Sequence, residues 1–285
     1  MSAKLLEGKP IAQKIQGQIS QEIQSARLNP ALASILVGEN AGAESYVKSQ
    51  KKLSESLGIN YQFHKLNAEL LESALIEFIQ KLNNDKNING IIIQMPLPAH
   101  IDGRKISNYI LPEKDVEGMH PANIGKLLFA KAKIIPCTAA SVMELINSTG
   151  IDLCGKEAAV VGHSEIVGKP LALLLLEKLA TVTVCHIGTS KAGKLEEHVR
   201  QAEVLIVAVG KANLIKGEWI KEGAIVVDVG INRLNDRIVG DVEFDEASKR
   251  ASWITPVPGG VGPLTVTMLM RNLVEAEKLQ QSYEF

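Results

Sequence analysis

The stretch Ala158–Leu176, AAVVGHSEIVGKPLALLLL, decides how the chain is expected to fold. A short apolar run, Ala158–Val161, ends at Gly162, and a loop with a second glycine, Gly168, leads into a long aliphatic segment. This order predicts a buried strand, a tight turn and a helix. Backbone N–H groups at the start of such a helix are unpaired, and with the helix dipole they favour a phosphate. The stretch therefore indicates the start of a nucleotide-binding βαβ unit.

The same stretch departs from the dinucleotide fingerprint G-x-G-x-x-G, because Ser164 occupies the place of the second glycine and Gly168 comes late. Taken alone, it fits an ordinary strand–helix turn equally well. Three further apolar strands lead to a glycine, and they span residues 181–185, 204–209 and 224–229. Four such strand ends with helices between them predict a doubly wound sheet that binds its ligand at the carboxyl ends of the strands.

The first half of the chain predicts another α/β unit with a mainly parallel sheet. Isoleucines spaced by four residues indicate a helix within 1–28, and further helices are expected over 44–57 and 70–82. Strands are expected over 31–37, 61–66 and 90–94. Thr138 is expected to N-cap a helix over 139–148, and a last helix runs from Thr265 towards Leu279. The expected domains are 1–137 plus 265–285, and 138–264.

Composition narrows the class of protein. The chain has 285 residues, 46% of them apolar, and a formal net charge of −1, so no nucleic-acid or acidic-membrane partner is expected. Its three cysteines, Cys137, Cys154 and Cys185, have no metal-binding spacing, which predicts reduced, buried thiols in a cytoplasmic protein without a metal. The first 23 residues are not typical of a signal peptide, and no apolar run is long enough to span a bilayer.

A Pro- and Gly-rich segment, Thr255–Pro263, resembles the signature of the bacterial FolD family of methylenetetrahydrofolate dehydrogenase/methenyltetrahydrofolate cyclohydrolases. Stretches similar to the family continue in the right order along nearly the whole chain: Val37-Gly38, Ser45–Val47, Gln94–Pro98, Lys114–Val116, Ile135–Thr138, Val161-Gly162, Ile166–Pro170 and Asp228–Arg233. The resemblance implies an N-terminal α/β folate and catalytic domain, a C-terminal Rossmann-like nucleotide-binding domain, a folate cleft between them, and a homodimer.

The resemblance also implies two reactions with different demands. Oxidation of 5,10-methylenetetrahydrofolate passes a hydride to a nicotinamide, and the protein mainly orients the two rings. Hydrolysis of the methenyl product to 10-formyltetrahydrofolate needs proton transfer and thus a group with a tuned pKa. In the family a Tyr-x-x-x-Lys motif supplies that group, but here the motif is Tyr46-Val47-Lys48-Ser49-Gln50. Glutamine forms hydrogen bonds but cannot exchange a proton near neutral pH.

Neighbouring residues do not obviously replace the missing lysine. Lys48 points away from Tyr46 on a helix, and Lys51 lies about 140° from it. A second departure is Glu117, where the family has an aspartate that anchors the pterin; Glu117 keeps the charge and adds a methylene. Gln94 matches a family glutamine that should help to orient the lysine or the folate.

The resemblance implies these site residues, each at its matching position. The catalytic set is Tyr46, Gln50, Gln94 and Glu117. The folate, expected to be polyglutamylated, is bound by Tyr46, Gln94, Pro96, Leu97, Glu117, Pro258, Gly259, Gly260, Gly262 and Pro263. The cofactor is bound by Cys137, Thr138, Gly162, His163, Ser164, Ile166, Val167, Ile187 and Ile231.

NADP is the family's usual cofactor, and NAD is an alternative. His163 and Ile187 stand where the family often has an arginine and a serine for the 2′-phosphate, which weakens phosphate recognition. The end of the second strand, Val184–His186, nevertheless offers no acidic residue for a free ribose 2′-hydroxyl. His163 or His186 could assist a phosphate when protonated.

Gln50 and Glu117 together motivate the hypothesis of a working dehydrogenase with weakened or absent cyclohydrolase activity. The competing hypothesis is a bifunctional enzyme in which Lys51 or an ordered water replaces the lysine. Two rivals come from other classes: a shikimate-type dehydrogenase, and a non-catalytic folate or nucleotide sensor.

Overall fold

The computed structural model describes residues 2–282, which divide into two compact units. Unit 1 takes in the chain up to Gln13 and Thr138–Thr265, and unit 2 takes in Lys14–Cys137 and the chain from Val266 onward. The first residues therefore belong with the second predicted domain, contrary to our expectation. The reason is a short strand, β1 (Lys4–Leu5), which pairs in parallel with β11 (Trp253–Ile254) of unit 1.

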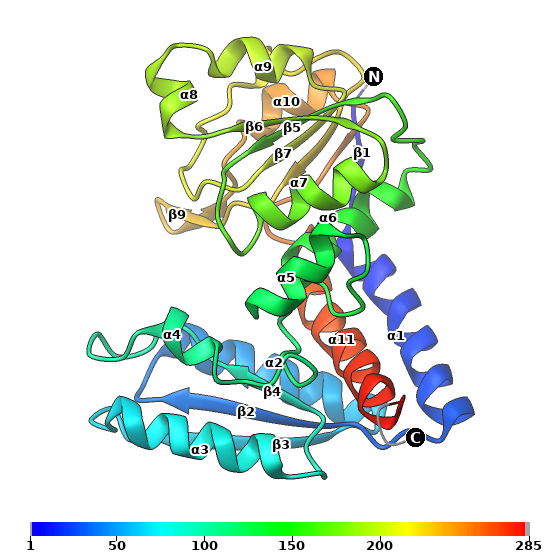
Figure 1. The fold of residues 1–285 in the computed structure, drawn as a ribbon. Helices are drawn as coiled ribbons and strands as arrows, with labels where there is room; N and C mark the ends of the chain where they lie inside the picture. Colours follow the sequence, from blue (N-terminus) through cyan, green and yellow to red (C-terminus); the bar gives the residue numbers. More distant parts are fainter. Residues whose placement is uncertain (1, 283–285) are drawn as a thin grey trace. The chain divides into compact units, whose positions relative to one another are not determined.

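Unit 1 is built on a parallel sheet that also contains β5 (Glu157–Val161), β6 (Thr181–Cys185), β7 (Val204–Val207) and β8 (Ile225–Asp228) (Figure 1). The strand order is β1-β11-β8-β7-β5-β6. Counted from β5, this is the 2-1-3-4-5 order of doubly wound folds, and the order reverses between β5 and β7. Ligands of such folds bind outside the carboxyl ends of the strands at that reversal.

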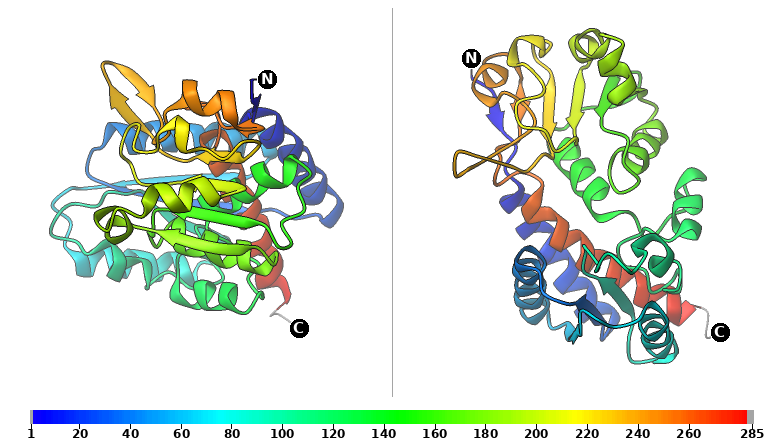
Figure 2. Two further views of the ribbon diagram at one scale, coloured as in Figure 1. Left: turned by 90° about the horizontal axis from the view of Figure 1, so that it is seen from above. Right: turned by 90° about the vertical axis from the view of Figure 1, so that its left-hand side faces the viewer.

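Helices cover both faces of this sheet (Figure 2), and alternating residues of each strand face opposite sides. Ala159, Val161 and Leu205 form a buried core with Val199 of α9 (Leu195–Gln201) and with α10 (Phe244–Arg250). The aliphatic segment of the opening stretch forms α7 (Gly168–Glu177), whose Leu171 and Leu175 are fully buried. The remaining elements are α6 (Cys137–Ser148), α8 (Ile187–Lys191), η1 (Gly217–Trp219), β9 (Asn232–Leu234) and β10 (Arg237–Val239). Since α6 begins at Cys137, Thr138 lies in its first turn and is not its N-cap.

Unit 2 contains a smaller parallel sheet in the order β3-β2-β4, formed by β2 (Ala31–Val37), β3 (Asn60–Leu66) and β4 (Gly90–Ile93). Its helices are α2 (Ala41–Leu57), α3 (Glu72–Asn84), α4 (Gly103–Ser107) and α5 (Pro121–Leu128), with most of α1 (Gly8–Ala26) and α11 (Gly262–Ser282). The predicted strands and long helices of this half are confirmed within a few residues. Gly58 ends α2 with φ of 73°, in the left-handed conformation expected of its C′ position.

Every residue of β2 is buried, and alternate side chains face opposite sides of the sheet. Ala33 and Ile35 pack in a core with Leu75 and Ile79 of α3. Ser34 lies between them in sequence and therefore faces the other side. A serine in the middle of a fully buried strand needs a hydrogen-bond partner. Ser34 finds this partner in Gln94, and both belong to the candidate site of unit 2.

The three cysteines differ from the expectation that all are buried. Cys185 is buried and Cys137 is half-buried, but Cys154 is exposed in a turn before β5, and none of the three forms a disulfide. Among the described residues, no helix combines the length and the apolar character needed to cross a lipid bilayer.

Candidate functional site

A cavity of about 340 Å³ lies at the carboxyl ends of β5, β6 and β7, where the strand order reverses. Four of the predicted cofactor residues, Gly162, His163, Ser164 and Ile187, line it. The other lining residues are Val161, His186, Ser190, Leu195, Ala208, Val209, Lys211 and Leu214. The position and the lining fit a nicotinamide dinucleotide, which needs both an apolar wall and polar groups.

Two glycines allow the turn between β5 and α7. A Cβ atom on Gly162, whose φ is 116°, would lie 2.2 Å from the carbonyl oxygen of Ala208. A Cβ on Gly168 would lie 2.0 Å from the carbonyl oxygen of Gly162. Ser164 replaces the second glycine of the usual fingerprint. It stabilises the turn, because its Oγ accepts the N–H of Val167 at 3.2 Å. The departure from the fingerprint is thus compatible with a nucleotide-binding turn.

Two histidines face each other in this cavity, with ring centroids 5.2 Å apart. The Nδ1 atom of His186 accepts the N–H of Gly188 at 3.0 Å, and Thr189 completes a capping box at the start of α8. This leaves Nε2 of His186 as the nitrogen available to a ligand. Among the described residues that line the cavity, none is acidic, and Lys211 adds a positive charge. Sequence reasoning missed Lys211 because it follows the third strand and belongs to no motif.

The other five predicted cofactor residues do not line this cavity. Ile166 and Ile231 are exposed, with relative accessibilities of 59% and 72%, and Val167 precedes α7. Cys137 is directed towards α11, because Nδ2 of Asn272 donates to its Sγ at 3.4 Å. Burial raises the pKa of the Cys137 thiol well above its usual value, so it is an unreactive group. Thr138 follows it in the first turn of α6.

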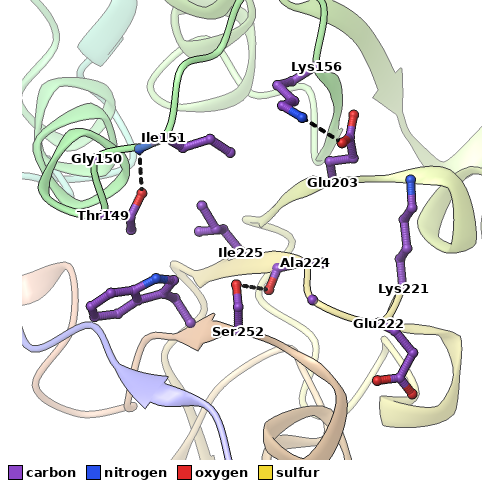
Figure 3. A pocket seen from close by; sticks show the side chains of 12 residues that line it. Thr149, Gly150, Ile151, Lys156, Glu203, Lys221, Glu222, Ala224, Ile225 and Ser252 are labelled. Carbon is purple, nitrogen blue, oxygen red and sulfur yellow. Dashed lines mark hydrogen bonds and ion pairs between the residues drawn. The ribbon is translucent and has the colours of Figure 1, made fainter.

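A second cavity, of about 310 Å³, lies at the opposite edge of the same sheet, around the amino ends of β5, β7, β8 and β11. Figure 3 shows Lys156 and Glu203 facing each other there, with Nζ and Oε1 3.0 Å apart. Its lining contains no predicted site residue, and its two lysines are matched by two glutamates. Because doubly wound sheets bind ligands at the carboxyl edge, the first cavity is the candidate cofactor site.

In unit 2, a cluster of uncharged polar side chains lies between α2 and the sheet. Gln50 of α2 and Ser34 of β2 are fully buried, and Gln94, directly after β4, is 3% exposed. Tyr61 of β3 completes the cluster and is half-buried. Tyr46 lies one helical turn before Gln50 and is also half-buried. The structure therefore brings together Gln50 and Gln94, two members of the catalytic set that the resemblance implies.

The amide oxygen of Gln50 accepts two hydrogen bonds. Gln94 Nε2 donates to Gln50 Oε1 at 3.1 Å and to Ser34 Oγ at 3.0 Å. The hydroxyl of Tyr61 donates to the same Gln50 oxygen at 3.0 Å. Within the described residues, Nε2 of Gln50 has no hydrogen-bond partner although it is buried. An unpaired buried donor costs about 1–3 kcal/mol, so this group is available to pair with an acceptor.

No member of this cluster can carry a charge near neutral pH. Serine and glutamine do not titrate, and burial raises the pKa of Tyr61, only partly offset by a hydrogen bond with Ser34. The nearby lysines, Lys48, Lys51 and Lys52, are exposed on the other face of α2. Nζ of Lys51 lies 3.9 Å from Glu55 Oε1, on a side chain that is 60% exposed. These lysines therefore form a solvated face of α2.

In the stretch Lys114–Glu117, the first three residues form hydrogen bonds with neighbouring parts of the protein. Lys114 is buried, and its Nζ donates to the carbonyl oxygens of Leu82 and Asp85 at the end of α3. Asp115 accepts the N–H of His120 at 2.7 Å, ahead of α5. The backbone of this stretch also binds α11, because Asn272 Nδ2 donates to the carbonyl oxygen of Val116 at 2.8 Å.

Glu117 is the residue of this stretch that remains for a ligand. It is half-buried, and burial together with the charge of Asp115 raises the pKa of its carboxyl group to about 8. We expected Glu117 to keep the negative charge of the family's aspartate. In the free protein at neutral pH it is instead mostly protonated, so it can both donate and accept a hydrogen bond.

The remaining predicted folate residues fall in two places. Pro96 is exposed and Leu97 half-buried, in the segment after Gln94. The others, Pro258, Gly259, Gly260, Gly262 and Pro263, belong to unit 1, in the loop before α11 and at its first residues. In that unit the carbonyl oxygen of Gly259 accepts the N–H of Gly8 at 2.9 Å, which fixes the loop against the start of α1.

Comparisons with known proteins cover both units. Residues 6–117 match the family profile described as tetrahydrofolate dehydrogenase/cyclohydrolase, catalytic domain, and residues 136–281 match the NAD(P)-binding domain of the same family. The chain is 50% identical over 284 residues to the bifunctional protein FolD of Acetivibrio thermocellus, covering 98% of this chain and 99% of that protein. The crystal structure of the bifunctional enzyme FolD from Campylobacter jejuni has a TM-score of 0.93 and 44% identity, covering 98% of this chain and 100% of that one. FolD from Trypanosoma brucei, complexed with NADP cofactor and inhibitor, has a TM-score of 0.93 and 37% identity, covering 99% of both chains.

The raised pKa of Glu117 predicts a pH-dependent stability. Between its ordinary value of 4.5 and about 8, the folded protein holds a proton that the unfolded chain has lost. The contribution of Glu117 to the free energy of unfolding therefore falls as pH rises through this window. Glu117→Gln removes that dependence, so its Tm should rise relative to the parent between pH 6 and 9. The exposed Glu69→Gln is the control, and parallel Tm curves for the parent and Glu117→Gln would contradict the prediction.

Proposed function

The chain belongs to the tetrahydrofolate dehydrogenase/cyclohydrolase family, and from this premise we propose that it is a methylenetetrahydrofolate dehydrogenase whose cyclohydrolase activity is weakened or absent. The observation that carries the proposal is the uncharged cluster around Gln50, in which no group exchanges a proton near neutral pH. Membership of this family also rules out the alternative of a shikimate-type dehydrogenase.

The dehydrogenase reaction requires the protein to hold and orient two rings, the nicotinamide and the pterin. A bound nicotinamide supplies the hydride acceptor. The cavity at the ends of β5, β6 and β7 supports the dinucleotide, and Glu117 and Gln94 offer hydrogen-bonding groups to a pterin. The reaction leaves a methenyl cation that its own nitrogens stabilise, so the loss of a lysine does not remove a group this step requires. We therefore expect oxidation to remain.

The cyclohydrolase reaction requires a group that moves a proton to or from water and the reacting nitrogen. Gln50 stands at the lysine position, and its oxygen is already bound by Tyr61 and Gln94. Gln94 is in turn committed to Ser34, so it is held as a fixed amide. Lys51 is turned to solvent and paired with Glu55, which argues against the alternative that it replaces the lysine. Positioned acids and bases contribute about 10²–10⁴-fold, and that is the size of the expected deficit.

Gln50→Lys should restore hydrolysis of methenyltetrahydrofolate. The new ammonium would enter a fully buried position with Tyr61 and Gln94 as partners, and burial lowers a lysine pKa towards neutral. We expect the hydrolysis rate to rise at least about tenfold over the parent. Gln50→Met, which has a similar length and no acid–base group, is the matched control and should bring no gain. Equal rates for the two folded variants would contradict the assignment.

We further propose NADP as the preferred cofactor, with NAD as the alternative. The cavity contains Lys211 and two histidines, and its described lining offers no carboxylate to a free ribose 2′-hydroxyl. Both features favour a 2′-phosphate over a hydroxyl. The protein from Trypanosoma brucei with bound NADP, at 37% identity, supports the same choice.

Lys211→Gln tests the cofactor choice. If Lys211 binds the 2′-phosphate, kcat/KM for NADP should fall about fivefold to tenfold, because an exposed charge pair contributes on the order of 1 kcal/mol. The value for NAD should change by less than about twofold, since NAD has no phosphate there. Lys216→Gln, at another exposed lysine, is the control. An equal loss with both cofactors would mean that Lys211 does not distinguish them.

A homodimer is also proposed, with β3 as part of the contact. β3 is an edge strand of its sheet in the described chain, and Phe63 on it is 42% exposed. Unpaired strand edges readily pair with another chain. Sedimentation at micromolar concentration should give twice the 30.8 kDa mass of one chain, and Phe63→Glu should shift the protein towards monomer. A parent that sediments as a monomer would rule this out.

Purified protein, methylenetetrahydrofolate and NADP or NAD together test the central activity. Reduced nicotinamide should form only when folate and cofactor are both present. Binding of both ligands without hydride transfer would instead favour the non-catalytic sensor.

A further inference from the structure

We infer that Asp241 is a positioning residue for the cofactor site, which it shapes through the loop after β7; this inference rests on the proposed dinucleotide function. Asp241 is fully buried in unit 1, directly after the β9–β10 hairpin. It belongs to none of the predicted site sets. It touches the loop residues Val209 and Lys211, which line the cofactor cavity.

The carboxylate of Asp241 is saturated with donors. Its Oδ2 atom accepts the N–H groups of Val209 and Gly210 at 2.7 and 2.9 Å. Its Oδ1 atom accepts the N–H of Lys211 and Nδ2 of Asn232, both at 2.8 Å. A carboxylate has about four acceptor positions, so three consecutive backbone amides and one side chain fill it. No neutral side chain of the same shape can do this, since an asparagine would turn a donor towards donors.

A second buried carboxylate holds Asp241 in place. Asp228, at the end of β8, accepts the backbone N–H groups of Asp241 and Val242 at 3.0 and 2.8 Å. Two glycines allow this close approach. A Cβ atom on Gly230 would lie 2.3 Å from the Asp241 carboxyl, and one on Gly240 would lie 2.0 Å from Asp228 Oδ2. The end of β8 and the loop after β7 are thereby tied together through two anions.

The direction of these bonds decides what the loop offers to a cofactor. In a peptide group the N–H and the C=O point in opposite directions. Because the N–H groups of Gly210 and Lys211 point towards Asp241, the carbonyl groups of Val209 and Gly210 point away from it. The backbone of the loop therefore presents acceptors on its outer side, which suit the ribose hydroxyls or the amide N–H₂ of a dinucleotide, and only the Lys211 side chain remains for a phosphate.

Asp241→Asn tests this role. It keeps the shape but leaves two buried donors facing an amide N–H₂, so the loop loses its fixed direction. We expect the Kd for reduced dinucleotide, measured by its fluorescence, and the cofactor KM to rise about tenfold, a loss typical of unpaired buried donors. The folate KM should change by less than about twofold, because no contact with folate is lost. Asp236→Asn, at the hairpin turn with a 91% exposed side chain, is the matched control and should change nothing.

Asn232→Ala is the second variant, in case Asp241→Asn does not fold. It removes one of the four donors and should raise the cofactor Kd in the same direction by a smaller factor, with an unchanged folate KM. Equal changes in the cofactor and folate constants, or no change in either, would overturn the inference. If the parent protein shows no folate-dependent reduction, the proposed activity fails, and the dinucleotide Kd of the variants still decides the role of Asp241.

Discussion

Two hydrogen bonds to one amide oxygen determine the chemistry available in unit 2. Gln50 is fully buried, so its Oε1 atom needs donors, and Tyr61 and Gln94 supply them at 3.0 and 3.1 Å. A lysine at the same place would need acceptors and would bring a proton that can be exchanged. The neutral network closes around the glutamine instead. Tyr61 and Gln94 are thereby both occupied in holding a group that cannot titrate.

The two units satisfy different physical requirements. Unit 1 positions a dinucleotide by turns and buried carboxylates, which require glycines at close approaches and tolerate Ser164 in the fingerprint. Unit 2 needs a few polar groups at the end of a small sheet. Hydride transfer depends mostly on placing two rings, whereas hydrolysis depends on a pKa. A substitution at Gln50 therefore affects the second reaction far more than the first.

Sequence reasoning predicted the parallel sheets and the long helices, because these follow from apolar periodicity and from a family resemblance spread along the chain. It did not predict that β1 joins the sheet of unit 1, since two residues carry no periodic signal. It could not identify Tyr61 as a partner of Gln50, because their contact depends on how α2 packs on β3. The raised pKa of Glu117 could not be predicted from the sequence either, since it depends on burial and on the nearby Asp115, and not on the residue type. The role of Asp241 depends on bonds to a loop about thirty residues away, which no local pattern encodes.

The decay of methenyltetrahydrofolate, supplied directly to the purified protein and followed by its absorbance, tests the central claim most simply. It isolates hydrolysis from hydride transfer and needs no cofactor. With a neutral Gln50 cluster, the decay should stay close to the rate in buffer alone, whatever the dehydrogenase rate of the same preparation. A decay that is proportional to protein concentration and about a hundredfold above buffer, the size a positioned acid–base group provides, would show that another residue moves the proton. The assignment of the Gln50 cluster would then be wrong.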